Sequence, residues 1–142
     1  MMLKTPRQSV SYLIPSFLCG RLVLERGNVG DYRTLERFHY RAKSPATWTE
    51  VWVVRYLPED VRGGIAESHS CVVAAAVVSY PTLACHLRDA ALSLTQMEPK
   101  AKVRWVNRNV RTISRVAVHP QFRSLGLACA LVRCVLYHCR TR

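Results

Sequence analysis

The alternation of hydrophobic and polar positions along the chain predicts four β-strands. Residues 21–26 (RLVLER) alternate between polar and apolar side chains, as expected of a strand with one buried face. Residues 48–57 are rich in β-branched and aromatic side chains, which favour strands. Residues 71–80 are almost entirely apolar, which is typical of a strand covered on both faces. Residues 112–118 (TISRVAV) form the fourth predicted strand, which ends before Pro120.

Apolar residues at helical spacing predict a helix after the first strand. Tyr32, Leu35 and Phe38 recur at intervals of three residues, so we expect a short helix over residues 31–41. The turn before it supplies an N-cap, most simply Asp31, because a carboxylate there can accept a hydrogen bond from the first free amides of the helix.

The segment between the third and fourth strands is a helical insertion, residues 81–110. Five apolar residues in it share one helix face and predict an amphipathic helix: Leu83, Leu87, Ala90, Ala91 and Leu94. A second short helix is expected at its end, through Val103, Val106 and Val110. After the fourth strand, residues 124–138 are apolar almost all round. They predict a helix that lies against the sheet with other structure on its far side.

These elements follow the order β-α-β-β-(helical insertion)-β-α. The order predicts an α/β (α+β) domain with a mixed, mainly antiparallel sheet flanked by helices, spanning residues 21–142. We interpret residues 1–20 as a loosely ordered lead-in. Their apolar stretch is short and interrupted by Pro15, unlike that of a signal peptide.

Composition narrows the class of protein. The 142 residues include 49% hydrophobic and 21% charged side chains, which excludes a disordered tail, a collagen and a coiled coil. No apolar run approaches the roughly 20 residues of a membrane span, so we expect no membrane partner. The net charge of +12 is compatible with an anionic partner, which the sequence leaves open among a phosphorylated cofactor, RNA, DNA and an acidic protein. The densest basic stretch, residues 100–115, is the candidate surface for nucleic acid.

The six cysteines indicate a reducing compartment. They contain no C-x-x-C pair, and a secreted disulfide scaffold of this length would carry more cysteines and a smaller apolar core. We therefore expect a cytoplasmic protein. Cys134 and His138 would share one helix face, but two ligands do not make a metal site, so no metal is predicted.

The segment most informative about chemistry is residues 113–130, ISRVAVHPQFRSLGLACA. It joins a strand, a proline-containing turn and the start of the apolar helix. The first amides of a helix lack partners within it, and the helix dipole favours negative charge there, so this point can bind phosphate oxygens. Gly126 lets a diphosphate approach the backbone, Ala128 is small, and Arg123 can add positive charge.

This segment resembles motif A of the GCN5-related N-acetyltransferases. The motif, [Q/R]-x-x-G-x-[G/A], is matched by Arg123, Gly126 and Ala128, preceded by the strand end Val116-Ala-Val118-His-Pro. A looser likeness over residues 21–138 is to acetyltransferase-like domains appended to bacterial ABC-type ATPases, although no G-x-x-x-x-G-K-[ST] motif is present.

The resemblance implies an acetyl-CoA-dependent N-acetyltransferase that transfers an acetyl group to a primary amine by direct attack in a ternary complex. It implies that the diphosphate of acetyl-CoA lies on the backbone amides of the motif loop, namely Arg123, Ser124, Leu125, Gly126, Leu127, Ala128 and Cys129. The pantetheine arm would pair with the backbone of Val116 and Val118, and the Val118 amide would polarise the acetyl carbonyl. The acceptor would be an amine on a small molecule, a protein or RNA.

Two departures from the family pattern affect this expectation. About thirty residues, 81–110, separate two strands that a short hairpin normally joins. The chain also stops at Arg142, just after the motif helix, where the family's fold continues with a strand, a helix and a hairpin. We therefore expect a copy of the fold truncated after the motif A helix, with half of the transfer cleft and doubtful activity.

The catalytic residues stay unassigned at this stage. The general-base candidates that fall in suitable portions of the chain are Glu36, His39, Glu50 and His119. Two alternatives to an enzyme remain open. One is a non-catalytic basic module of the same fold that binds nucleic acid or protein. The other is an inactive fragment whose sheet is completed by a second chain.

Overall fold

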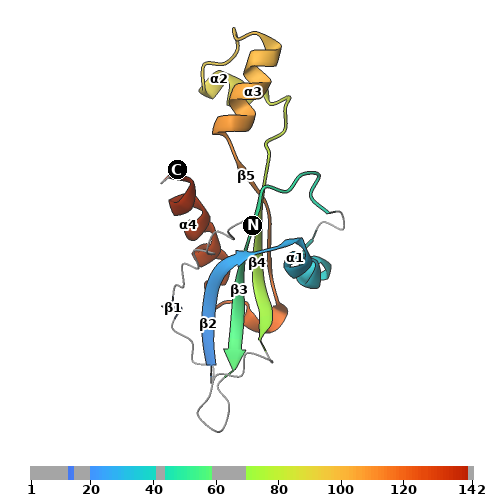
Figure 1. Ribbon diagram of the computed structural model, residues 1–142, viewed down its shortest axis with the longest axis vertical. Coiled ribbons are helices and arrows are strands. Elements are labelled where there is room, and N and C mark those ends of the chain that lie inside the picture. Colours follow the sequence, from blue (N-terminus) through green and yellow to red (C-terminus); the bar gives the residue numbers. More distant parts are fainter. Residues whose placement is uncertain (1–12, 15–19, 41–43, 59–69, 141–142) are drawn as a thin grey trace, which may run out of the picture.

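A computed structural model describes residues 13–14, 20–40, 44–58 and 70–140 of the chain. Its strands are β1 (Leu13–Ile14), β2 (Gly20–Gly27), β3 (Glu50–Pro58), β4 (Cys71–Ser79) and β5 (Thr112–Val118). They form one sheet in the order β1-β2-β3-β4-β5 (Figure 1), and all four pairings are antiparallel. The sheet and its flanking helices confirm the expected α+β fold.

The helices differ more from expectation than the strands do. They are α1 (Val29–Leu35), continued by the 3-10 turn η1 (Glu36–Phe38), then α2 (His86–Ala91), α3 (Pro99–Asn109), the 3-10 turn η3 (Pro120–Phe122) and α4 (Leu127–Arg140). The fourth predicted strand is confirmed at both ends. The lead-in is not wholly without structure, because Leu13–Ile14 pairs with Val23 and Leu22 of β2.

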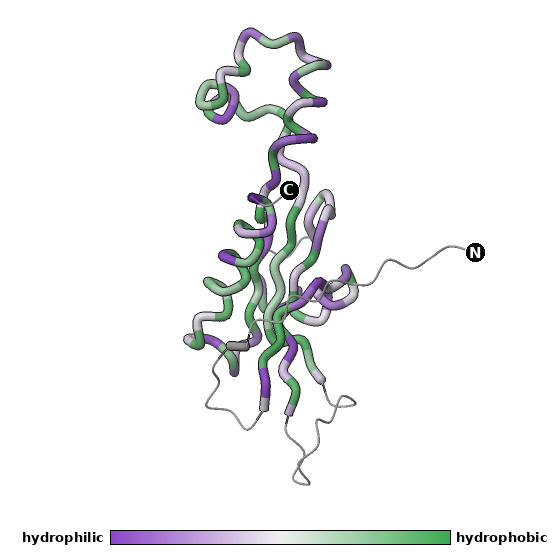
Figure 2. Tube along the Cα trace, turned by 60° about the vertical axis from the view of Figure 1, so that its left-hand side comes forward, coloured by the Kyte–Doolittle hydropathy of each residue, from purple (hydrophilic) through white to green (hydrophobic). Residues whose placement is uncertain are grey.

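The sheet carries one hydrophobic core on each face. Helix α4 covers one face and α1 the other (Figure 1). Strand β4 serves both cores, because its side chains alternate between the faces. Ala74, Ala76 and Val78 pack in the core beneath α4, whereas Ala75 and Val77 pack beneath α1. This confirms the prediction that this strand is covered on both faces. In Figure 2 its tube is mostly in the hydrophobic colours.

Helix α1 is capped one turn earlier than predicted. The N-cap is Asn28, whose side chain accepts a hydrogen bond from the Asp31 amide at 3.1 Å. Asp31 is the N3 residue and accepts in return from the Asn28 amide at 2.8 Å, which completes a capping box. Asn28 and Asp31 can each cap a helix, and in the structure both take part in capping α1.

Helix α4 begins at Leu127, three residues later than expected, and its outward face is open. Leu136 and Tyr137 are 53% and 63% exposed. The expectation of structure on the far side of this helix is therefore not met by the described residues. No helix in the described ranges is long and apolar enough to cross a membrane.

The insertion forms a small lobe, defined here as residues 81–111, that extends beyond the end of the sheet (Figure 1). Its second helix, α3, is confirmed. The first is wrong in length and orientation, because α2 spans six residues and leaves Leu87 82% exposed while Asp89 is buried. Leu83 and Leu87 are thus exposed, Leu94 is buried beyond the end of α2, and the carboxylate of Asp89 lies in the interior of the lobe.

Candidate functional site

A groove of about 510 Å³ lies where β5 ends and α4 begins. One wall is the end of β5 and the motif loop with the first residues of α4, and the other is the end of η1 and the residues after it. The described lining consists of Phe38, His39, Tyr40, Val116, Ala117, Val118, Phe122, Arg123, Ser124, Gly126, Leu127, Ala128 and Cys129.

Two left-handed residues shape the motif loop. Ser124 has φ +66° and Gly126 has φ +74°. For a side-chain-bearing residue such as Ser124, this conformation costs about 1–2 kcal/mol, and strain of this kind clusters at functional sites. A Cβ built on Gly126 would meet no atom within 4 Å. The glycine therefore meets a conformational requirement and leaves open space in front of the backbone.

The start of α4 turns free amides toward this groove. The first helical hydrogen bond runs from the Ala130 amide to the Gly126 carbonyl at 3.0 Å. The amides of Leu127, Ala128 and Cys129 precede that bond, so they have no acceptor within the helix. All three residues line the groove, and the exposed Arg123 adds a guanidinium beside them. The arrangement suits an anion with several oxygens.

The free edge of β5 continues the groove along the sheet. His119 donates its amide to the Val73 carbonyl on β4 at 2.8 Å. Backbone groups of successive strand residues point to opposite sides, so Val118 and Val116 direct theirs away from β4. In the described part of the chain no strand pairs on that side of β5. An extended chain with amide groups can therefore bind there as an added strand does.

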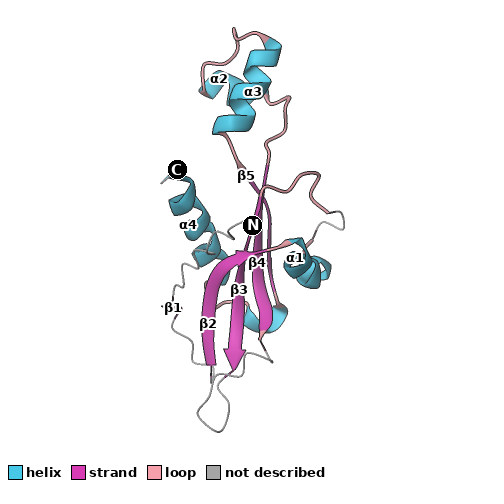
Figure 3. Cartoon of the chain, in the orientation of Figure 1, coloured by secondary structure: helices cyan, strands magenta, loops and turns pink. Residues whose placement is uncertain are grey.

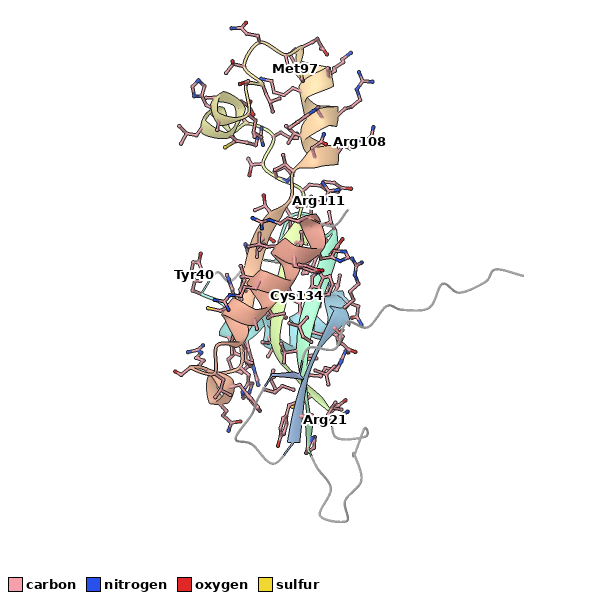
Figure 4. All side chains as sticks on the ribbon, turned by 90° about the vertical axis from the view of Figure 1, so that its left-hand side faces the viewer. Arg21, Tyr40, Met97, Arg108, Arg111 and Cys134 are labelled. Carbon is pink, nitrogen blue, oxygen red and sulfur yellow. The ribbon has the colours of Figure 1, made fainter. Side chains whose placement is uncertain are left out.

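Aromatic side chains form the opposite wall. The ring of Phe38 packs edge-on against His119 with centroids 4.9 Å apart, which joins the end of η1 to the motif loop. His39 and Tyr40 lie side by side with ring centroids 4.6 Å apart. Figure 4 shows the side chain of Tyr40 extending outward from the body of the molecule. Phe38 and Phe122 also line the groove and were not predicted as site residues. Phe122 directly follows the turn at Pro120, whereas Phe38 lies far from that turn in the sequence and gave no signal of its place in the groove.

The groove gathers eight of the nine residues expected to contact acetyl-CoA. Leu125 is the exception, because it lies outside the lining and is partly exposed. Of the four general-base candidates, His39 is the one in the lining. Glu36 instead accepts a hydrogen bond from Ser44, and His119 packs between aromatic rings and accepts from the Gln121 amide.

Glu50 belongs to a separate cluster at the other end of the sheet. Its carboxylate accepts from Arg26 and from the Trp52 indole, both at 3.1 Å, and His138 packs edge-on against Trp52. Burial raises the pKa of the Cys134 thiol, opposed by the positive charge of Arg26, so this cysteine stays protonated at neutral pH. Within the described ranges no three His, Cys, Asp or Glu side chains gather as a metal site would require.

No protein-family model matches this chain, and the comparisons with curated proteins and with solved structures found no match. What the groove can bind therefore follows from its own geometry and chemistry. It combines a helix start with three free amides, an open strand edge and an aromatic wall, and these three features suit one elongated ligand with an anionic end and an amide-bearing arm.

Proposed function

We propose that this protein is an acetyl-CoA-dependent N-acetyltransferase that acts on a primary amine. The observation that carries the proposal is the meeting of eight residues of the motif loop and β5 in one groove. A strand end, a left-handed glycine and a helix start are brought together there in the order that binding of acetyl-CoA requires. We place the reaction in the cytoplasm, as the sequence indicates.

The residues present fit the co-substrate. The amides of Leu127, Ala128 and Cys129 would hold the diphosphate, with Arg123 neutralising part of its charge. The open space at Gly126 would admit the diphosphate, and any Cβ would occupy that space. The pantetheine arm carries amides that would pair with the outward backbone groups of β5.

Acetyl-CoA supplies an activated acyl group, and the chain's part is to bind and orient it. The Val118 amide points to the open edge and would donate a hydrogen bond to the carbonyl oxygen, where negative charge develops when the amine attacks. The acceptor amine would approach from the side of His39 and Tyr40. His39 is the candidate for removing its proton, because it is the general-base candidate in the lining. No covalent cysteine intermediate is invoked.

Calorimetric titration with acetyl-CoA tests the assignment. The wild type is compared with Gly126→Gln and Gly126→Glu, which add side chains of equal size at the same left-handed position. We expect binding by the wild type, weaker binding by the glutamine variant, and a further loss of about tenfold or more in the glutamate variant. Like charges about 4 Å apart repel by about 1–4 kcal/mol between water and a protein surface.

The glutamine variant is the control for bulk and backbone strain, and a carboxylate at a helix start favours the helix, so misfolding does not explain a difference between the two. Equal affinity of all three proteins, or no heat of binding by the wild type, would contradict the proposal. A wild type that binds acetyl-CoA but acetylates no amine would indicate the alternative, a binding module of this fold.

A further inference from the structure

The lobe carries more positive charges than its acidic residues balance, although Arg111 already donates to the carbonyls of Asn107 and Val110. Its two acidic residues are both engaged internally. Asp89 pairs with Arg88 at 2.6 Å and with Lys102 at 3.3 Å. Glu98 caps α3 by accepting from the amides of Lys100 and Ala101. The remaining cations of the lobe are therefore not balanced by its acids.

Three of those cations form a stripe on α3, defined here as the basic stripe: Lys100, Arg104 and Arg108. They follow one another at intervals of four residues, so they lie on one face of the helix. This face is turned away from Val106, the buried residue of α3. Like charges at this spacing destabilise a helix by about 0.2–0.5 kcal/mol per pair. The stripe therefore does not stabilise the helix by itself. A bound partner with a row of negative charges would offset this repulsion.

An aromatic residue borders the stripe. Trp105 follows Arg104 directly and is 37% exposed, so part of its indole is available for stacking. At the C-terminal end of α3 the stripe leads into a second groove of about 500 Å³, whose lining includes Arg108, Asn109 and Arg111. In Figure 4, Arg108 and Arg111 follow one another from α3 toward the C-terminal end of α4.

We propose that this surface of the lobe binds single-stranded nucleic acid. The basic stripe and Arg111 would follow successive phosphates, and Trp105 would stack on a base. The lobe stands clear of the sheet (Figure 3), so a strand can lie along α3 without blocking the groove at β5. This inference does not depend on the acetyltransferase proposal, because the two surfaces share no residue.

Nucleic acid fits the surface better than an acidic protein does. The positive charges are regularly spaced along one line, as phosphates are along a strand, and an exposed indole lies beside them. A single strand is favoured over a duplex because its bases are open to stacking on Trp105. The net charge of +12 would speed association with any polyanion. The test must therefore distinguish a single strand from a duplex and from an acidic protein.

The experiment is fluorescence-anisotropy titration of the full chain with a labelled 15-nucleotide oligouridine at several salt concentrations. We expect binding that weakens with salt. The double variant Arg104→Gln/Arg108→Gln should flatten the slope of log affinity against log salt by about 1.4, since each phosphate contact contributes about 0.7 for single strands. Arg104→Lys/Arg108→Lys keeps the charges and should keep the slope. Trp105→Leu should weaken binding and leave the slope unchanged.

The matched control is Arg21→Gln/Arg33→Gln, which removes two exposed arginines of β2 and α1. Figure 4 shows Arg21 at the opposite end of the molecule from the lobe. A control that loses as much slope as the stripe variant would overturn the proposal, as would undetectable binding at low salt. Equal competition by polyglutamate would overturn it in favour of an acidic protein, and equal affinity of duplex RNA would overturn the single-strand assignment.

Discussion

The sheet body and the lobe are held together by different forces. In the body, two layers of aliphatic and aromatic side chains are buried on either side of β4. In the lobe, the buried aliphatic side chains are Leu94 and Val106, and the interior is organised by a carboxylate. Arg88 holds Asp89 and also donates to the carbonyls of Thr82 and Leu83 at 2.5 and 2.9 Å.

This difference means that the two regions should respond to different perturbations. Apolar burial is insensitive to pH, and removal of a buried side chain acts on the whole cooperative unit. A segment that is held by ion pairs and buries few apolar side chains unfolds locally when those ion pairs are broken. We therefore expect the lobe to be the less stable of the two regions.

The largest effect is expected in the body. Leu131 of α4 is fully buried in the core against the sheet, so Leu131→Ala should lower the free energy of unfolding by about 2–5 kcal/mol. Urea denaturation followed by circular dichroism measures this. Leu136→Ala on the exposed face of the same helix is the control and should change it by less than about 0.5 kcal/mol. Equal losses would mean that the outward face of α4 is covered after all.

A smaller and local effect is expected from Asp89→Asn. The amide keeps the shape but loses the ion pairs with Arg88 and Lys102. Hydrogen exchange measured by mass spectrometry should become faster in peptides that cover α2 and α3 and stay unchanged in those from β4. Arg104→Gln, which removes an exposed charge from the same lobe, should leave the exchange as it is. Faster exchange throughout the sheet would show that the two regions unfold as one unit.

The smallest effect is a pH dependence confined to the lobe. Hydrogen bonds from Arg88, and after them those from Lys102, lower the pKa of Asp89 below its ordinary value of 3.8, against the opposing effect of desolvation. A lowered pKa in the folded state means that the stabilisation is complete above the ordinary value and is lost as the pH falls through the lowered one. Amide NMR shifts of α2, which carries Asp89, should therefore change below about pH 4, and in Asp89→Asn this transition should be missing.

Strand positions could be predicted from the sequence because their signals are local. The residues of β5 were predicted at both ends, since β-branched residues begin it and a proline-containing turn follows. The helix predicted over residues 83–94 failed for a physical reason. Helical spacing places Leu83, Leu87 and Leu94 on one face, but α2 begins after Leu83 and ends before Leu94, so the first two leucines are exposed and the third is buried. The polar network around Asp89 decided the orientation, and it depends on Lys102, thirteen residues away.

The candidate site was predictable where it is continuous in sequence. The motif loop and β5 together supplied eight predicted lining residues, because a strand, a turn and a helix start determine where free amides lie. The opposite wall was harder, since Phe38 reaches the groove only through the packing of η1 on His119. The left-handed conformation of Ser124 left no sequence signal, because serine rarely adopts it.

The pairing of β4 with β5 brings the two ends of the lobe close together. Ser79 and Thr112 face each other as the last pair of that ladder, so the thirty or so residues between them begin and end at neighbouring points. A segment attached in this way can be exchanged for a short turn, or grow longer, without moving a single strand. The lobe could thus change its surface in evolution while the sheet and the groove at β5 keep their geometry, and a protein engineer could exchange it in the same way.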